Sequence, residues 1–174
     1  MLIRLLPLVL GAVLAAGCSQ AEPNAEAENT AASEPQALTA DHVANLIAAD
    51  GAAHTYAVLT GPADPTGIDK VFKGMATGDP EWLALVPAIE PLTDGMYGEG
   101  IQYALMTALL HNTAGVLALM PDYGSYYFVC ADADRETARP LVAAVADPAL
   151  RAARDRCLQY MDADEKELEA LEAA

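Results

Sequence analysis

The predicted fold depends on residues 98–111, whose sequence is GEGIQYALMTALLH. Large apolar side chains recur in this stretch at intervals of three and four residues, which is the period of a helix. They cover most of the circumference of that helix, and a helix without a polar face has to lie inside a domain. The stretch therefore predicts a central helix against which the other elements pack.

The sequence on both sides of this helix repeats the same spacing and is interrupted by glycine and proline. The clearest start signal is Asp79–Pro80, because a carboxylate caps free amides and a proline needs no amide bond at the first helical position. Pro87 is expected to kink or end the helix that begins there. The other expected helices cover residues 40–49, 52–59, 67–77, 114–120 (ended by Pro121), 139–146, and 148 onward with fraying beyond residue 162.

Residues 122–130 depart from the helical pattern. Their sequence, DYGSYYFVC, is the one stretch of the chain that is rich in aromatic and β-branched residues. Such residues favour extended backbone, so the stretch predicts a short extended segment. In that conformation Tyr126, Phe128 and Cys130 share one face.

The fold class expected from these patterns is mostly α. We expect a single small helical bundle, or an irregular helix-pair domain, with one disulfide and one short extended aromatic segment. In apolar spacing, residues 80–91 and 98–111 resemble the helix pair of HEAT-type repeats. Asp–Pro pairs recur without a fixed period, so they indicate repeated helix caps and not an array.

Residues 1–17 have the layout of an export signal, with Arg4, an apolar core (Leu5–Leu14) and then small residues. The core is shorter than the roughly 20 residues that a membrane-spanning helix needs. Residues 14–18 are LAAGC, which resembles the lipobox of bacterial lipoproteins. The resemblance implies that Cys18 is lipidated, that the signal is removed before it, and that acyl chains anchor the protein. An ordinary secreted protein with a chance cysteine is the alternative.

The residues after the lipobox predict the location and the domain organisation. Ser19 stands where lipoproteins kept in the inner membrane have aspartate, so the resemblance implies the inner leaflet of the outer membrane, facing the periplasm. Residues 18–38 are small, polar and acidic and cannot bury enough surface to fold, so they predict a disordered tether spanning about 25 Å. Residues 39–174 have the size of one helical domain.

The chain is strongly acidic, with 25 Asp and Glu against 9 Lys and Arg. Signal removal takes away one base, which leaves a net charge near −17. We therefore expect no binding to nucleic acid, because phosphate contacts need clustered Lys and Arg. A basic partner or cationic ligand is attracted instead; the alternative is that the charge serves solubility alone.

Cys130 and Cys157 are the two cysteines outside the lipobox. An even pair in an oxidising compartment predicts a disulfide. Closing the loop between them contributes about 3.5 kcal/mol in the chain-entropy model. A free reactive thiol is the alternative, since Arg154 and Arg156 flank Cys157.

The sequence offers few candidates for catalysis. Serine occurs at only three positions, and Ser125 lacks the GxSxG frame of a hydrolase nucleophile. Glu90, Asp94 and Glu99 are the candidate carboxylates for an envelope hydrolase that acts on peptidoglycan, which needs one carboxylate in an apolar pocket. No residue is assigned a catalytic role.

No metal site or cofactor is expected. His42, His54 and His111 fall on three separate predicted helices without an HxxxH pair. The acidic runs that begin at Asp132 and Asp162 lack the glutamate that ends a calcium-binding loop.

A cluster of Tyr123, Tyr126, Tyr127 and Phe128 contains four of the ten aromatic residues. Aromatic side chains concentrate at interface hot spots, so the cluster is a candidate binding edge; packing against the helices is the alternative. The resulting interpretation is a membrane-anchored periplasmic lipoprotein that acts as a non-catalytic interaction module, an adaptor or inhibitor, with a periplasmic protein partner. The alternatives are the envelope hydrolase and an immunity-type lipoprotein that neutralises a toxin.

Overall fold

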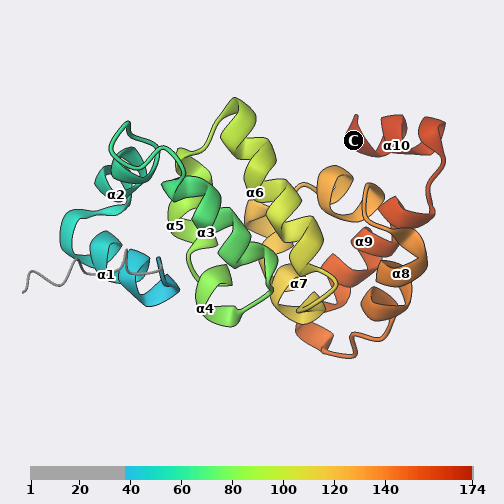
Figure 1. Cartoon of the computed structure of the whole chain (residues 1–174). Helices are drawn as coiled ribbons and strands as arrows, with labels where there is room; N and C mark the ends of the chain where they lie inside the picture. Colours follow the sequence, from blue (N-terminus) through green and yellow to red (C-terminus); the bar gives the residue numbers. More distant parts are fainter. Residues whose placement is uncertain (1–37, 174) are drawn as a thin grey trace, which may run out of the picture. The chain divides into compact units, whose positions relative to one another are not determined.

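Residues 38–173 are described by a computed structural model of the chain. Within this range the chain forms ten α-helices and no strand, so the predicted mostly α fold is confirmed (Figure 1). The predicted signal, the predicted lipidation site Cys18 and the predicted tether as far as residue 37 lie outside the described residues.

Short connections join the helices. The α-helices are α1 (Ala40–Asp50), α2 (Ala52–Leu59), α3 (Gly67–Ala76), α4 (Pro80–Leu83), α5 (Val86–Ile89), α6 (Gly95–Ala108), α7 (Thr113–Tyr123), α8 (Arg135–Ala143), α9 (Arg151–Asp162) and α10 (Glu165–Glu172). Three further helical turns lie between them: the 3-10 helices η1 (Glu90–Leu92) and η3 (Pro148–Leu150), and the π-helix η2 (Tyr127–Ala131).

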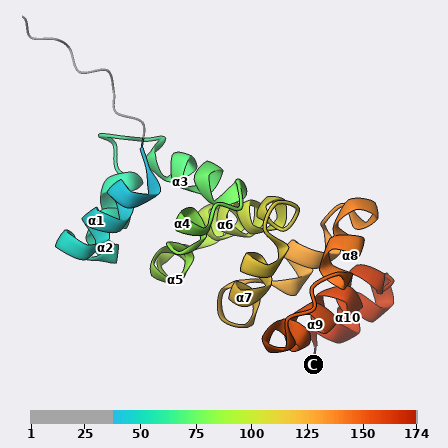
Figure 2. The same cartoon turned by 90° about the horizontal axis from the view of Figure 1, so that it is seen from below.

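The most extensive packing is between α3 and α6, which are separated in sequence by α4, α5 and η1; α1 also packs on α2, and α9 packs on α8 and η2 (Figures 1 and 2). Their apolar faces form one continuous core. The largest side chains that are fully buried in it are Val43, Ile68, Val71, Met75, Val86, Ile89, Ile101, Leu105, Leu109, Leu117, Met120 and Met161.

Helix starts follow the capping signals in the sequence. The side chain of Thr39 accepts a hydrogen bond from the amide of His42, and that of Asp79 accepts one from Glu81. Asp147 caps η3 in the same way. These side chains satisfy amides that have no partner within their helix, which is why each start falls where the sequence predicts it.

The helix expected over residues 80–91 is broken into α4, α5 and η1. Pro87 causes the break, because it has no amide hydrogen and its ring clashes with the carbonyl of Leu83, where α4 ends. The expected pairing of residues 80–91 with residues 98–111 was therefore wrong. The main partner of α6 is α3.

The predicted central helix is α6, which packs against α3, α7 and η2. Ile101, Leu105 and Ala108 are fully buried along it. Tyr103 is half exposed, so one face of α6 is open to solvent. The helix begins at Gly95, three residues earlier than predicted.

Several helix ends differ from the predictions. Pro121 lies inside α7, near its end, and α8 begins at Arg135 because Asp134 caps it. The chain does not fray after residue 162. Instead Asp164 and Glu167 form a capping box that starts α10, with each side chain accepting a hydrogen bond from the other residue's amide.

The expected extended segment at residues 122–130 was wrong, because the chain is helical on both sides of a short turn at Gly124 and Ser125. No strand lies within residues 38–173 to pair with it, and unpaired buried backbone is costly. Winding into η2 satisfies these groups internally; the amide of Val129, for example, donates to the carbonyl of Ser125 at 2.9 Å.

The predicted disulfide between Cys130 and Cys157 is confirmed, and it joins η2 to α9 with 5.4 Å between the two Cα atoms. Both cysteines are fully buried, which excludes the alternative of a reactive surface thiol.

Reducing this disulfide is expected to lower the free energy of unfolding by about 3.5 kcal/mol, because the 27-residue separation is then no longer closed in the unfolded chain. Chemical denaturation of the full chain with and without reductant measures the difference. With Cys18 replaced by serine, thiol counting under denaturing, non-reducing conditions should find no free thiol. Two reactive thiols would contradict the assignment.

Glycine allows α3 and α4 to approach closely. A Cβ atom added at Gly74 would overlap the indole ring of Trp82. Overpacking of this kind costs about 1–3 kcal/mol, and alanine gains roughly 1 kcal/mol over glycine in a helix, so we expect Gly74→Ala to destabilise the domain by a net amount of up to about 2 kcal/mol.

Gly98→Ala is the matched control for this substitution, because the nearest atom to its added Cβ is the Thr93 hydroxyl oxygen at 3.9 Å. This control is expected to leave stability unchanged or raise it by up to about 1 kcal/mol. Urea denaturation measures both variants. Equal stability of Gly74→Ala and the unsubstituted chain would show that the contact is unimportant.

Candidate functional site

A buried glutamine positions the segment that carries the aromatic cluster. Gln102 on α6 is only 9% exposed, and both ends of its amide are satisfied. Its Nε2 donates to the carbonyl of Tyr123 at 3.2 Å, and its Oε1 accepts from the amide of Ser125 at 2.8 Å. The turn between α7 and η2 is therefore held on the central helix. Nothing in the sequence singled out this residue.

The four residues of the predicted binding edge lie in different environments. Tyr123 and Tyr126 are partly buried against the core, so packing accounts for much of their surface. Tyr127 is 37% exposed, and the ring of Phe128 meets it edge-on at 5.6 Å between centroids. Of the four, Tyr127 is the side chain best placed for recognition, and that role stays a prediction.

Tyr126 stacks on Tyr160 of α9, with 5.8 Å between ring centroids. The guanidinium of Arg156 lies 5.2 Å from the centre of the Tyr160 ring, which is a cation–π distance. Burial raises the pKa of Tyr126 above its ordinary value of 10, while the positive charge of Arg156 opposes this rise.

α10 is held to the rest of the chain by a small set of contacts. Leu168 and Leu171 are partly buried against the core, and no residue of α10 is fully buried. The hydroxyl of Tyr160 donates to Glu172 Oε1 at 2.8 Å. Burial, and then this hydrogen bond, raise the pKa of Tyr160 above its ordinary value of 10.

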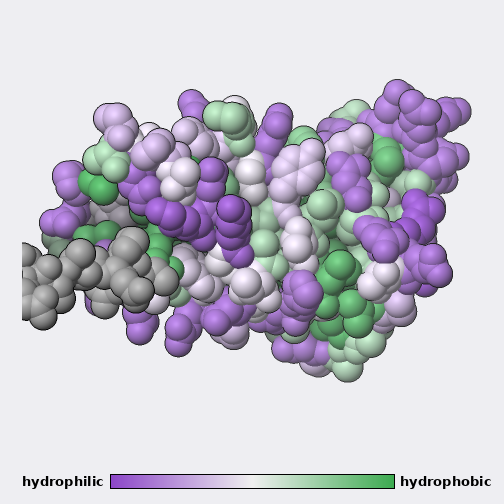
Figure 3. All heavy atoms as spheres, in the orientation of Figure 1, coloured by the Kyte–Doolittle hydropathy of each residue, from purple (hydrophilic) through white to green (hydrophobic). Residues whose placement is uncertain are grey.

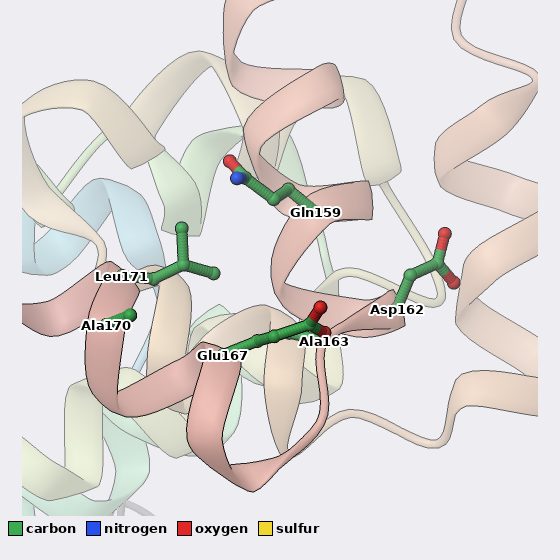
Figure 4. A pocket seen from close by; sticks show the side chains of 6 residues that line it. All are labelled: Gln159, Asp162, Ala163, Glu167, Ala170 and Leu171. Carbon is green, nitrogen blue, oxygen red and sulfur yellow. The ribbon is translucent and has the colours of Figure 1, made fainter.

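A first cleft of about 510 Å³ lies between α9 and α10 (Figure 4). Its polar side chains are largely engaged in structural roles. Asp162 makes a bidentate ion pair with Arg139 at 2.7 and 2.8 Å, which lowers the pKa of that carboxyl. Glu167 belongs to the capping box. The remaining lining consists of Gln159, Ala163, Ala170 and Leu171.

A second cleft, which we name the Tyr127 cleft, lies between η2 and α10 and has a volume of about 410 Å³. Tyr127 and Leu168 form its apolar part, and three carboxylates, Glu165, Glu169 and Glu172, line the rest. Hydrophilic side chains cover α10 at the upper right of Figure 3. Within residues 38–173, none of the three glutamates forms an ion pair.

The two clefts differ in the charge they can offer a ligand. The carboxylates of the first cleft are occupied by Arg139 and by backbone amides, whereas Glu165 and Glu169 of the Tyr127 cleft are exposed and have no cationic partner in the described range. The Tyr127 cleft is therefore the better candidate site for a cationic group.

None of the candidate carboxylates for a hydrolase is buried. Asp94 and Glu99 are exposed and Glu90 is partly buried, whereas a glycosidase acid needs a carboxylate removed from water. In the part of the chain that is described, no three His, Cys, Asp or Glu side chains are grouped to hold a metal ion.

Comparison of the chain with protein-family models, curated proteins and solved structures finds no match. This outcome is consistent with a body of no recognised family, as the sequence predicts. The HEAT-like spacing of residues 80–91 and 98–111 finds no support from a matching structure.

Glu172→Gln is expected to lower the pKa of Tyr160 toward its ordinary value, because it removes the carboxylate that favours the protonated phenol. The raised pKa means that the folded state prefers the neutral hydroxyl. The stability that the protonated Tyr160 hydroxyl contributes is fully present below pH about 10, the pKa of tyrosine in the unfolded chain. It is lost as the pH rises through the raised pKa of the folded state.

Absorbance titration of tyrosinate measures this shift, with Tyr160→Phe identifying the contribution of that residue. Glu169→Gln is the control, since its side chain has no hydrogen bond to Tyr160 within the described residues. An unchanged titration in Glu172→Gln would contradict the assigned hydrogen bond.

Proposed function

We propose that this protein is a membrane-anchored periplasmic lipoprotein that acts as a non-catalytic interaction module, either an adaptor or an inhibitor. The observation that carries the proposal is the Tyr127 cleft, in which an exposed aromatic ring lies beside carboxylates without cationic partners. Aromatic residues are enriched among interface hot spots, and unpaired surface carboxylates attract a complementary partner.

The anchor is supported by the lipobox-like sequence at residues 14–18 and by the polar, acidic residues that follow it. Within residues 38–173, no helix has the length and apolar character that crossing a membrane requires. A lipid anchor with a flexible tether lets a binding domain reach partners some distance from the bilayer surface.

Chemical crosslinking of the lipidated protein in intact cells, followed by purification and mass spectrometry, tests the interaction role. The proposal expects one abundant envelope partner. A toxin as that partner would identify the module as the immunity type. Only nonspecific neighbours, together with fragments released from peptidoglycan by the purified protein, would support the hydrolase instead.

Cys18→Ser is expected to abolish lipidation and to release the protein from the membrane fraction, or to leave it with an uncleaved signal. Fractionation of cells measures this. Ser19→Asp is the matched variant, because the resemblance to lipoproteins implies that it keeps the lipidated protein in the inner membrane. A fully membrane-bound, processed Cys18→Ser protein would show that the anchor is not at this residue.

A further inference from the structure

The charges on α10 are arranged unfavourably for an isolated helix. Glu165, Glu169 and Glu172 are spaced four and three residues apart and so lie on one face, within about 10 Å along the axis. Like charges at this spacing repel each other. Glu169 and Glu172 are also near the C-terminal end, where the helix dipole favours cations, and the last turn contains no basic residue.

Residues from neighbouring elements do not neutralise this face within the described range. The guanidinium of Arg156 lies over the Tyr160 ring and forms no ion pair with Glu172. Lys166 is exposed on α10 and lines a shallow depression together with Asp164 and the same Glu165 and Glu169, but it forms no ion pair with a carboxylate of the described residues.

We propose that the Tyr127 cleft binds a basic segment of a partner protein, with a lysine or arginine side chain lying against the ring of Tyr127 and its charge facing Glu165 and Glu169. This inference rests on the proposed function, since it names the partner chemistry of the same site.

The apolar part of the cleft suits the stem of such a side chain. Long cationic side chains bury their methylene groups on apolar surface and keep the charged end in water or against an anion. Tyr127 and Leu168 supply that surface beside the carboxylates. The chain already shows the same chemistry a short distance away, where Arg156 lies on the Tyr160 ring.

The dimensions of the cleft also fit. Its volume of about 410 Å³ is in the lower part of the usual range for ligand pockets, roughly 300–1,000 Å³, and suits side chains of a segment more than a folded surface. Glu165 and Glu169 are separated by about 6 Å along the axis. Cationic side chains four residues apart on a helix, or two apart on an extended segment, have a similar spacing.

Charge excludes the other occupants. Residues 18–38 of the chain itself contain four glutamates and no lysine or arginine, so they are repelled by this face. A second copy of the chain carries the same large negative charge, and nucleic acid and anionic lipid are repelled likewise. A basic segment of a different protein has the complementary charge.

Binding of a fluorescent peptide of alternating arginine and alanine to the full-length protein in non-ionic detergent tests the site. We expect saturable binding that weakens with added salt and about five- to tenfold weaker binding to Glu165→Gln/Glu169→Gln, since loss of each exposed ion pair weakens binding about two- to threefold. Tyr127→Leu should weaken binding about threefold, by loss of the cation–π contact.

Glu81→Gln/Glu136→Gln is the matched control. It removes the same number of charges from exposed positions in the first turns of α4 and α8, away from the cleft. Its affinity is expected to equal that of the unsubstituted chain. Equal weakening by both double variants, or unchanged binding in Glu165→Gln/Glu169→Gln, would overturn the proposal. Circular dichroism verifies that each variant is folded.

A photoreactive phenylalanine analogue, placed at position 127 or at position 103 in cells, separates this inference from the proposed function. Both sites carry an exposed tyrosine in the native chain. Crosslinking from position 127 to a lysine- or arginine-rich peptide of one partner supports the inference. A partner captured only from position 103 overturns the cleft assignment but keeps the interaction role. No specific partner from either position overturns both.

Discussion

The structure depends on the burial of α6. This helix has α3 against it on one side and α7 and η2 as its other neighbours, so its position determines where both halves of the described chain lie. Gln102 adds hydrogen bonds to the apolar packing by which α6 positions its neighbours. A buried amide is tolerated only where its donor and acceptor are paired, and here both are paired to backbone where α7 ends and the turn to η2 begins. The candidate site is thus attached to the centre of the fold by directional bonds.

The contacts that join η2 to α9 and α9 to α10 are of different kinds. The Cys130–Cys157 disulfide holds η2 on α9, and the stacked pair Tyr126 and Tyr160 joins the residue that precedes η2 to the same helix. The last helix, α10, contacts the rest of the chain through the Tyr160 hydroxyl and through the partly buried Leu168 and Leu171. α10 is therefore the least extensively packed α-helix of residues 38–173. The Tyr127 cleft has one wall on the disulfide-bonded part and the other on the least firmly held helix.

The sequence predicted local features well, because they depend on a few neighbouring residues. Thr39, Asp79 and Asp147 begin helices for reasons of capping chemistry alone, and the disulfide followed from an even pair of cysteines. Partner choice was not predictable in this way. Apolar spacing predicted that α6 is buried but not against what, and the contact with α3 requires the small Gly100 beside Phe72, where an added Cβ would lie 2.7 Å from the ring. The form of η2 also depended on tertiary context, since its aromatic residues favour a strand only where another strand is present.

The repulsion among the carboxylates of α10 and the few contacts that hold this helix together link ligand binding to its docking. An eight-residue helix is too short to be stable alone, so α10 depends on its capping box, on Leu168 and Leu171, and on Tyr160. Repulsion among its carboxylates works against those contacts. A cation bound in the Tyr127 cleft removes part of that repulsion, and any ligand that binds only the docked helix stabilises the docked state by mass action. Binding and the docking of α10 are therefore linked, because the same carboxylates that weaken the isolated helix provide the attraction for the ligand.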